Sequence, residues 1–171
     1  MKKIKLFATN AHLFDKDGDT SKELNFMKKS IQVYKTKNQY KIITMYRTEA
    51  WSYIAGEPLY LLPLDISIQE FLKVILEGLN HSRSILELEV DKIWNNNKQL
   101  LKKIEAKSYD DLYKNSRSCD IYIEDKEITI KPNIYLDSKK GLQTDVESIV
   151  KIEFLEEKYL EIAKEIIKIL N

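Results

Sequence analysis

Three aspartates at alternate positions, Asp15, Asp17 and Asp19, have the spacing with which a calcium-binding loop presents its first ligands. Such a loop also needs a glycine at its sixth position and a bidentate glutamate at its twelfth. This chain has Thr20 and Phe26 at those two positions. We therefore interpret the segment as a turn, and we expect neither a metal nor a cofactor.

Nucleophiles and soft metal ligands are few, because the chain has one cysteine, Cys119, and two histidines, His12 and His81. A structural zinc site needs about four such ligands, so none is predicted. Cys119 could attack a substrate if a histidine lay beside it, but it introduces an alternating strand pattern, where a buried, inert thiol is more common. A lone cysteine also forms no internal disulfide, which favours a cytoplasmic protein. No enzymatic activity is predicted.

Phosphate-binding loops are rich in glycine, and this sequence has only four glycines, all isolated: Gly18, Gly56, Gly78 and Gly141. The net charge of +1 also disfavours a protein whose main affinity comes from neutralising phosphates. The ten tyrosines lie among many lysines and could stack on single-stranded bases. A single-stranded nucleic-acid-binding module is therefore the alternative function, although strand positions such as Tyr34, Tyr40 and Tyr46 equally suit sheet packing.

Acidic side chains gather in two stretches of this nearly neutral chain. The solvated surface of a helix is the simpler interpretation of such clusters, and a binding surface for a basic partner is the functional one. The candidate binding residues are Glu77, Glu87, Glu89 and Asp91 in the first stretch, and Asp120, Glu124, Asp125 and Glu127 in the second.

The segments that position these residues alternate between strand and helix patterns. Period-two alternation predicts antiparallel strands around residues 31–33 and 40–42, joined near Lys37 and Asn38, and a hairpin pairing 121–123 with 128–130. A buried strand is expected at 59–62. Ser67 and Glu70 form a capping box that begins a helix over 68–79, and Ser108 begins a short helix over 109–114. A weaker helical pattern over 91–106 is interrupted at residues 95–97.

An amphipathic helix over about 156–170 closes the pattern. We therefore predict an α+β fold in which residues 1–171 form one domain, with a mainly antiparallel sheet and two principal helices, at about 68–79 and 156–170. The longest apolar run, residues 58–64, is far shorter than the roughly 20 residues that cross a bilayer, so no membrane association is expected.

The central part of the sequence resembles the immunity proteins of bacterial contact-dependent growth inhibition. The resemblance rests on Trp51–Ile54, Glu57–Asp65, Ser67 with its helix, and Asn80–Arg83, followed in order by Ser108–Leu112, Lys114–Asn115, Cys119 and Ile128–Pro132. These motifs mark strands, turns and helix starts, so the shared residues Trp51, Pro58, Pro63 and Ser67 are expected to serve folding. Arg83 follows a helix end and is expected to be a buried partner in an ion pair, with an exposed contact as the alternative.

This resemblance implies a cytoplasmic antitoxin that binds, one to one, the C-terminal toxin domain of a cognate cell-surface protein, commonly a nuclease. A nuclease presents a basic cleft to nucleic acid, and an acidic surface on the inhibitor would complement that cleft. The first acidic stretch is the first candidate surface and the second stretch is the next. A further possibility is that a toxin strand pairs with an exposed sheet edge at the hairpin around residues 124–127.

Overall fold

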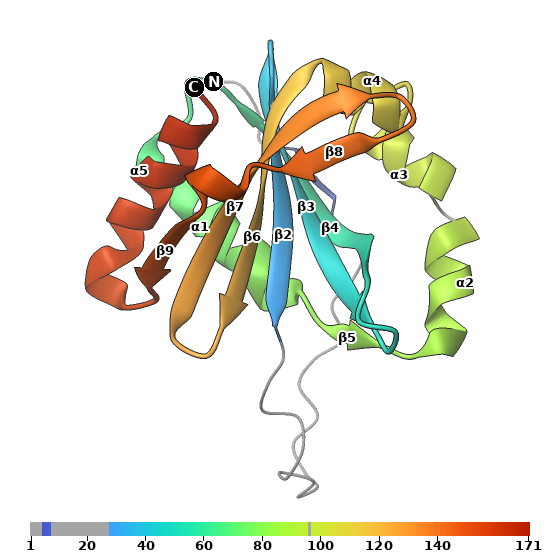
Figure 1. Ribbon diagram of the computed structural model, residues 1–171, viewed down its shortest axis with the longest axis horizontal. Helices are drawn as coiled ribbons and strands as arrows, with labels where there is room; N and C mark the ends of the chain where they lie inside the picture. The colour runs from blue at the N-terminus through green and yellow to red at the C-terminus, as the bar shows by residue number, and fades with distance from the viewer. Residues whose placement is uncertain (1–4, 8–27, 96) are drawn as a thin grey trace, which may run out of the picture.

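A nine-stranded sheet forms the centre of the computed structural model, which describes residues 5–7, 28–95 and 97–171 (Figure 1). The predicted turn at 15–19 and His12 lie outside the described residues. The strands are β1 (Lys5–Phe7), β2 (Lys29–Thr36), β3 (Gln39–Thr48), β4 (Tyr53–Pro63), β5 (Ser84–Ile85), β6 (Ser116–Glu124), β7 (Glu127–Asp137), β8 (Gly141–Thr144) and β9 (Val150–Glu153).

The helices are α1 (Ile68–His81), α2 (Glu87–Asn95), α3 (Asn97–Lys103), α4 (Tyr109–Lys114) and α5 (Tyr159–Ile169), with short 3-10 turns at Val146–Ser148 (η1) and Glu156–Lys158 (η2). The main strand order is β1-β4-β3-β2-β6-β7-β8, with β5 beside β3 and β9 beside β7. All pairings are antiparallel except that of β3 with β5. The predicted α+β fold with a mainly antiparallel sheet is confirmed.

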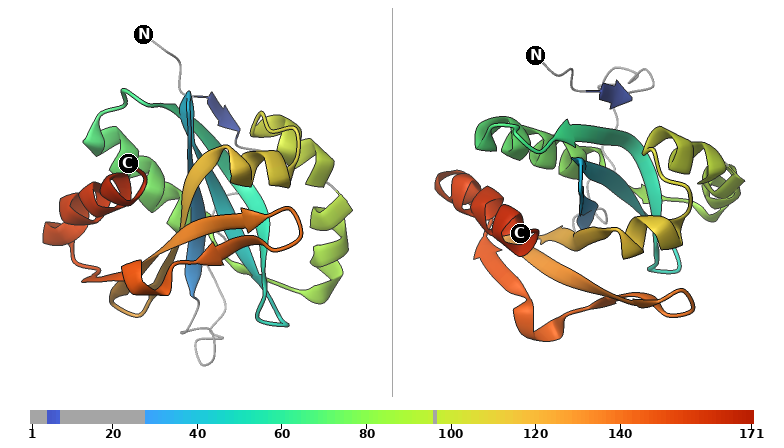
Figure 2. Two further views of the ribbon diagram at one scale, coloured as in Figure 1. Left: turned by 45° about the horizontal axis from the view of Figure 1, so that its top comes forward. Right: turned by 90° about the horizontal axis from the view of Figure 1, so that it is seen from above.

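One face of the sheet packs against α1 and α5, which lie side by side in both views of Figure 2. Alternate residues of the central strands supply this core, among them Ile31, Ile42 and Ile121, each fully buried. Ser67 caps α1 by accepting a hydrogen bond from the Glu70 N–H at 3.2 Å, as the capping box predicted. The burial of one helical stripe accounts for most of the stability of such a layer.

The opposite face is covered over part of its area by α3 and α4, which bury a smaller cluster around Tyr34, Ile43 and Leu61. Ser108 caps α4 as predicted, accepting from the Asp111 N–H at 3.0 Å. Thus the sheet has apolar side chains on both sides in its central strands, which explains why the run at 59–62 lacks alternation.

The closing helix differs from the prediction at its start. Residues 156–158 form a 3-10 turn, and α5 begins only at Tyr159. None of the helices in the described part of the chain is long and apolar enough to cross a membrane.

Candidate functional site

Helix α2 carries three of the four residues of the first acidic stretch, Glu87, Glu89 and Asp91, within a single short helix. None of its nine residues, all of them described, is buried. Its apolar residues Val90 and Ile93 are only half-buried, so packing holds this helix less firmly than α1 or α5. Glu77 does not join the group, because it belongs to α1, where its backbone carbonyl lies 2.9 Å from His81 Nδ1. The structure thus brings three of the four residues together on one helix and places Glu77 on another.

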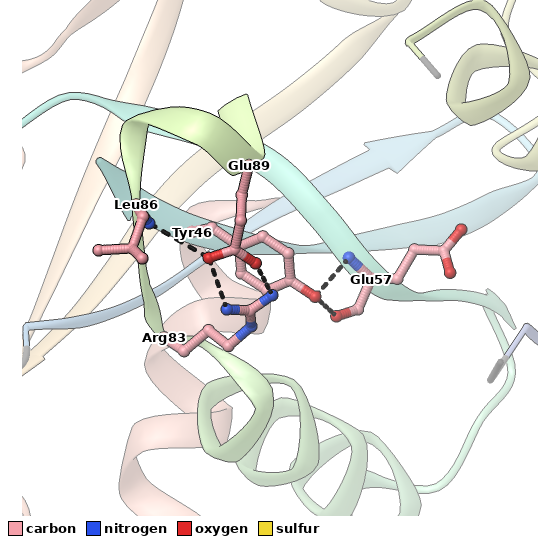
Figure 3. Close-up of polar contacts among 5 residues, drawn as sticks. All are labelled: Tyr46, Glu57, Arg83, Leu86 and Glu89. Atoms are coloured by element: carbon pink, nitrogen blue, oxygen red, sulfur yellow. Dashed lines mark hydrogen bonds and ion pairs between the residues drawn. The ribbon is translucent and has the colours of Figure 1, made fainter. Parts of the chain in front are cut away.

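The start of α2 is fixed by an ion pair between Arg83 and Glu89 (Figure 3). Arg83 Nη2 donates to Glu89 Oε1 at 2.9 Å, and the Leu86 N–H donates to Glu89 Oε2 at 3.2 Å. These hydrogen bonds, that from Arg83 above all, lower the pKa of the Glu89 carboxyl. Glu89 is therefore engaged within the chain. Arg83 makes the expected ion pair, but its side chain is 47% exposed, so this pair is not buried.

The Arg83 guanidinium also lies over the ring of Tyr46, 4.9 Å from its centroid. The Tyr46 hydroxyl donates to the Glu57 carbonyl at 2.6 Å and accepts from the Glu57 N–H at 3.2 Å (Figure 3). The side chain of this β3 residue thereby links β3 to the backbone of β4. This approach requires Gly56, since a Cβ there would lie 2.4 Å from Tyr46 Cε2. The Glu57 side chain forms an ion pair with Lys103 of α3.

A hollow of about 550 Å³ separates α2 and α3 from β4. Its lining includes Tyr46, Gly56, Glu89, Lys92 and Lys103. α2 contacts β4 beside this hollow and lies at the periphery of the molecule, as Figure 1 shows. Glu87 and Asp91 are exposed and make no ion pair with any residue that the structure describes. They are the available acids of this helix.

The residues of the second acidic stretch lie in two separate places. Glu124, Asp125 and Glu127 surround the β6–β7 turn, where Glu124 and Glu127 are paired opposite each other in the ladder. Their like charges are offset by ion pairs, Lys28 with Glu124 at 3.2 Å and Lys151 with Glu127 at 2.7 Å. Asp125 occupies a turn position with a φ of 55° and is exposed.

The expectation of an exposed sheet edge at this hairpin is wrong. Strand β6 has β2 on one side and β7 on the other, while residues 127–130 of β7 pair with both β6 and β9. The backbone groups of the hairpin strands therefore already have partners, and a toxin strand cannot add there. The sequence patterns did not reveal β9, whose four residues follow a 3-10 turn and carry only a short alternation.

Asp120 lies away from the turn, in the middle of β6 between Gln32 of β2 and Lys131 of β7. Its Oδ1 is buried without a hydrogen-bond partner among the described residues. Burial raises the pKa of this carboxyl, while hydrogen bonding from Asn133 and Gln32 acts in the opposite direction. Asp120 thus lies within the sheet, apart from Glu124, Asp125 and Glu127 at the turn.

Cys119, the other chemically reactive candidate, is fully buried in the core beneath α1 and α5. Burial raises the pKa of its thiol, which keeps the nucleophilic thiolate form scarce at neutral pH. His81 is exposed at the end of α1. The prediction of a buried, inert thiol is confirmed.

Trp51 was expected to serve folding, but its side chain is 77% exposed and lies outside the core. It occupies the turn between β3 and β4, close to the start of α2, and Glu49 of the same turn accepts a hydrogen bond from the Glu87 N–H at 3.2 Å. Residues 49–52 connect β3 to β4, and the sequence patterns did not reveal this turn or which of its side chains remains outside.

A family model described as CDI immunity protein matches residues 29–146. The chain belongs to the CDI immunity protein family, which assigns it a role in immunity to a toxin of contact-dependent growth inhibition.

Two solved structures share this fold at low sequence identity. A protein of unknown function from Neisseria meningitidis aligns with a TM-score of 0.67 and 16% identity, covering 88% of this chain and 98% of its own. A CdiA-CT/CdiI toxin and immunity complex from Yersinia pseudotuberculosis contains a chain that aligns with a TM-score of 0.64 and 16% identity, covering 84% and 95%. No curated protein sequence matches this chain significantly.

Proposed function

We propose that this protein neutralises a cognate toxin by binding, one to one and in the cytoplasm, the C-terminal domain of a contact-dependent growth inhibition protein, and that this toxin domain is a nuclease. The family match supports the immunity role. The structural similarity to a chain from a toxin and immunity complex is consistent with direct binding as the mode of action.

The observation that carries the nuclease proposal is the exposed acidic surface of α2. Glu87 and Asp91 extend into solvent on a helix without a buried residue, whereas Glu89, Glu124 and Glu127 are neutralised within the chain. A nuclease must hold a polyanion and therefore has a cationic substrate surface. Acidic groups that face such a surface accelerate association and reject partners of the wrong charge.

Inhibition by binding needs no chemistry from the immunity protein. The one thiol is buried and mainly protonated, and the described acids near α2 lie in ion pairs or on the open surface. Occlusion of the toxin's substrate cleft is therefore the proposed mechanism, with the acids of α2 in the place that phosphates would otherwise occupy.

Binding of single-stranded nucleic acid remains the second candidate, since one arrangement favours it. Lys28 and Lys131 both lie over the ring of Tyr122, at 5.2 Å and 4.9 Å from its centroid. Lysines beside a half-buried tyrosine are the residue types that bind phosphates and stack on bases. However, Glu124 pairs with Lys28 and Asp120 lies beside Lys131 in the sheet, so the local charge is balanced. Immunity by protein binding is the better supported function.

The test is co-expression of this chain with the C-terminal domain of the cognate toxin, followed by purification and a nuclease assay. A one-to-one complex without nuclease activity is expected, and activity should return when the immunity protein is removed. A complex that forms while the free toxin degrades neither RNA nor DNA would refute the nuclease proposal. Failure of the two chains to associate would refute direct neutralisation.

A further inference from the structure

Trp51 has a backbone conformation that a tryptophan rarely adopts. Its φ is 63°, in the left-handed region that favours glycine. The turn closes with the Trp51 N–H donating to the Thr48 carbonyl at 3.0 Å and the Thr48 N–H donating to the Ser52 carbonyl at 2.9 Å. In three-residue hairpin loops of this kind, the last loop residue is left-handed and is commonly glycine. A bulky residue there stores strain in the backbone.

Burial of the ring does not compensate for this strain, because 77% of the Trp51 side chain is exposed. The ring is nevertheless held in place. The guanidinium carbon of Arg47, on β3, lies 3.9 Å from the centroid of the Trp51 ring. A cation in contact with the ring face fixes the orientation of the side chain while its other face remains open to solvent. A strained but oriented aromatic side chain on a surface is a feature of binding sites rather than of cores.

Two exposed leucines lie next to this turn. Thr48 pairs with Ile85 in the ladder of β3 and β5, and Leu86 follows directly. Leu86 is 59% exposed and Leu88, in the first turn of α2, is 84% exposed. Figure 1 shows the β3–β4 turn beside the connection from β5 to α2, and the Glu49–Glu87 hydrogen bond links the two segments. We call Trp51, Leu86 and Leu88 the Trp51 patch.

Acidic side chains border the Trp51 patch. Glu49 lies in the turn, Glu87 begins α2, and both are exposed. Asp91 lies one turn further along the helix. An apolar centre with a charged rim is the usual layout of a protein interface, and tryptophan is enriched among the residues that contribute most to affinity. The rim here is negative, so it complements a positively charged partner.

We propose that the Trp51 patch is the apolar anchor of the toxin interface, and that it receives apolar side chains flanked by lysine or arginine on the basic surface of the toxin domain. This inference rests on the proposed function, because the partner is the same toxin. It assigns the affinity mainly to Trp51 and the leucines, and assigns to the acids around them the selection of a basic partner.

The test compares Trp51→Gly and Leu88→Ser with the control Val146→Ala, each titrated calorimetrically with the toxin domain. Val146 is 72% exposed, like Trp51, but it lies in η1. This turn follows β8 at one end of the main strand order, whereas the Trp51 turn joins β3 and β4 near the opposite end. Trp51→Gly and Leu88→Ser should each weaken binding at least about 30-fold, while Val146→Ala leaves it unchanged. The melting temperature of Trp51→Gly should be equal to or above that of the wild type, since glycine suits the left-handed turn.

The outcomes distinguish a failure of the proposed anchor from a failure of the proposed function. If the wild type binds the toxin and Trp51→Gly and Leu88→Ser bind it with the same affinity, the proposed anchor is overturned while toxin neutralisation stands. A lowered melting temperature for Trp51→Gly would show that the ring stabilises the fold, which would overturn the argument from strain. If the wild-type protein itself does not bind the toxin, the proposed function fails before the anchor is tested.

Discussion

The Nζ of Lys41 lies 2.6 Å from the carbonyl oxygen of Ile104, just beyond the end of α3. It also donates to the Glu105 carbonyl at 3.0 Å. The ammonium group thereby satisfies carbonyls that a helix end leaves without partners. The segment that carries α2 is thus fixed at both ends, by Arg83 and Glu89 before the helix and by Lys41 after α3, while α2 itself has no fully buried residue.

Replacement of Lys41 by methionine should lower the free energy of unfolding by about 1–3 kcal/mol, because two carbonyl oxygens lose their buried donor. Denaturation with urea, followed by circular dichroism, measures this change. Lys37→Met, at the exposed turn between β2 and β3, is the matched control and should stay within about 0.5 kcal/mol of the wild type. Equal effects of the two variants would contradict the capping role of Lys41.

Introduction of a side chain at Gly56 should destabilise the protein, since its Cβ would meet the Tyr46 ring at 2.4–2.6 Å. Gly56→Ala is expected to reduce the free energy of unfolding by about 1–3 kcal/mol, as overpacking usually does. In a Tyr46→Ala background the same substitution should have a much smaller effect, because the ring is gone. A double-mutant cycle by thermal or chemical unfolding gives the coupling, and simple additivity would exclude the predicted clash.

Charge reversal on α2 should weaken toxin binding by slowing association. Glu87→Lys combined with Asp91→Lys is preferred over any change at Glu89, whose ion pair with Arg83 holds the helix start. We expect the association rate, measured by stopped flow at low salt, to fall about 10-fold or more and the difference to shrink as salt rises. Asp125→Lys, on the exposed β6–β7 turn, tests the second acidic stretch, and a larger effect there would move the interface to that turn.

Asp120→Asn should stabilise the free protein at neutral pH. Burial raises the pKa of Asp120 above the ordinary value of 3.8, so the folded protein binds this proton more tightly than the unfolded chain does. The stability linked to this proton is complete below the ordinary pKa and is lost as the pH rises through the raised one. The variant should therefore melt at a higher temperature than the wild type at about pH 7, and the gap should close towards about pH 3.

Asp125→Asn is the control for this pH profile, because Asp125 is exposed and asparagine tolerates its left-handed φ. Its melting temperature should follow that of the wild type across the same range. A lower melting temperature for Asp120→Asn at neutral pH would mean that the ionised carboxylate is stabilising where it lies.

Periodic patterns and caps made most of the fold predictable. The stripe of apolar residues after Ser67, the short helix after Ser108 and the alternation on each side of residues 124–126 each became the expected element. These signals are local, since a side chain on the same segment satisfies the cap or shares the buried face. The short strands β5, β8 and β9 were missed because they form only through pairing with β3 or β7, at a distance in sequence.

The candidate surface was less predictable than the fold. Glu87, Glu89 and Asp91 could be grouped because one helix carries them, but the ion pair that removes Glu89 from the surface depends on how the chain turns after Arg83. Trp51 was assigned to folding because it is one of the residues shared with the family that the sequence resembles. Only the backbone conformation of the turn and the exposure of the ring identify it as a surface residue.

Cys119 offers a built-in reporter of partner binding. It is the one thiol in the sequence, and it lies on β6 between Val33 and Pro132 with no exposed surface. An alkylating reagent can therefore reach it only when the centre of the sheet opens, so the labelling rate follows the population of open molecules. A ligand bound to the closed form at 100 times its dissociation constant would slow this labelling about 100-fold. The labelling rate of this native thiol thus measures how tightly a partner stabilises the closed form, and no engineered label is needed.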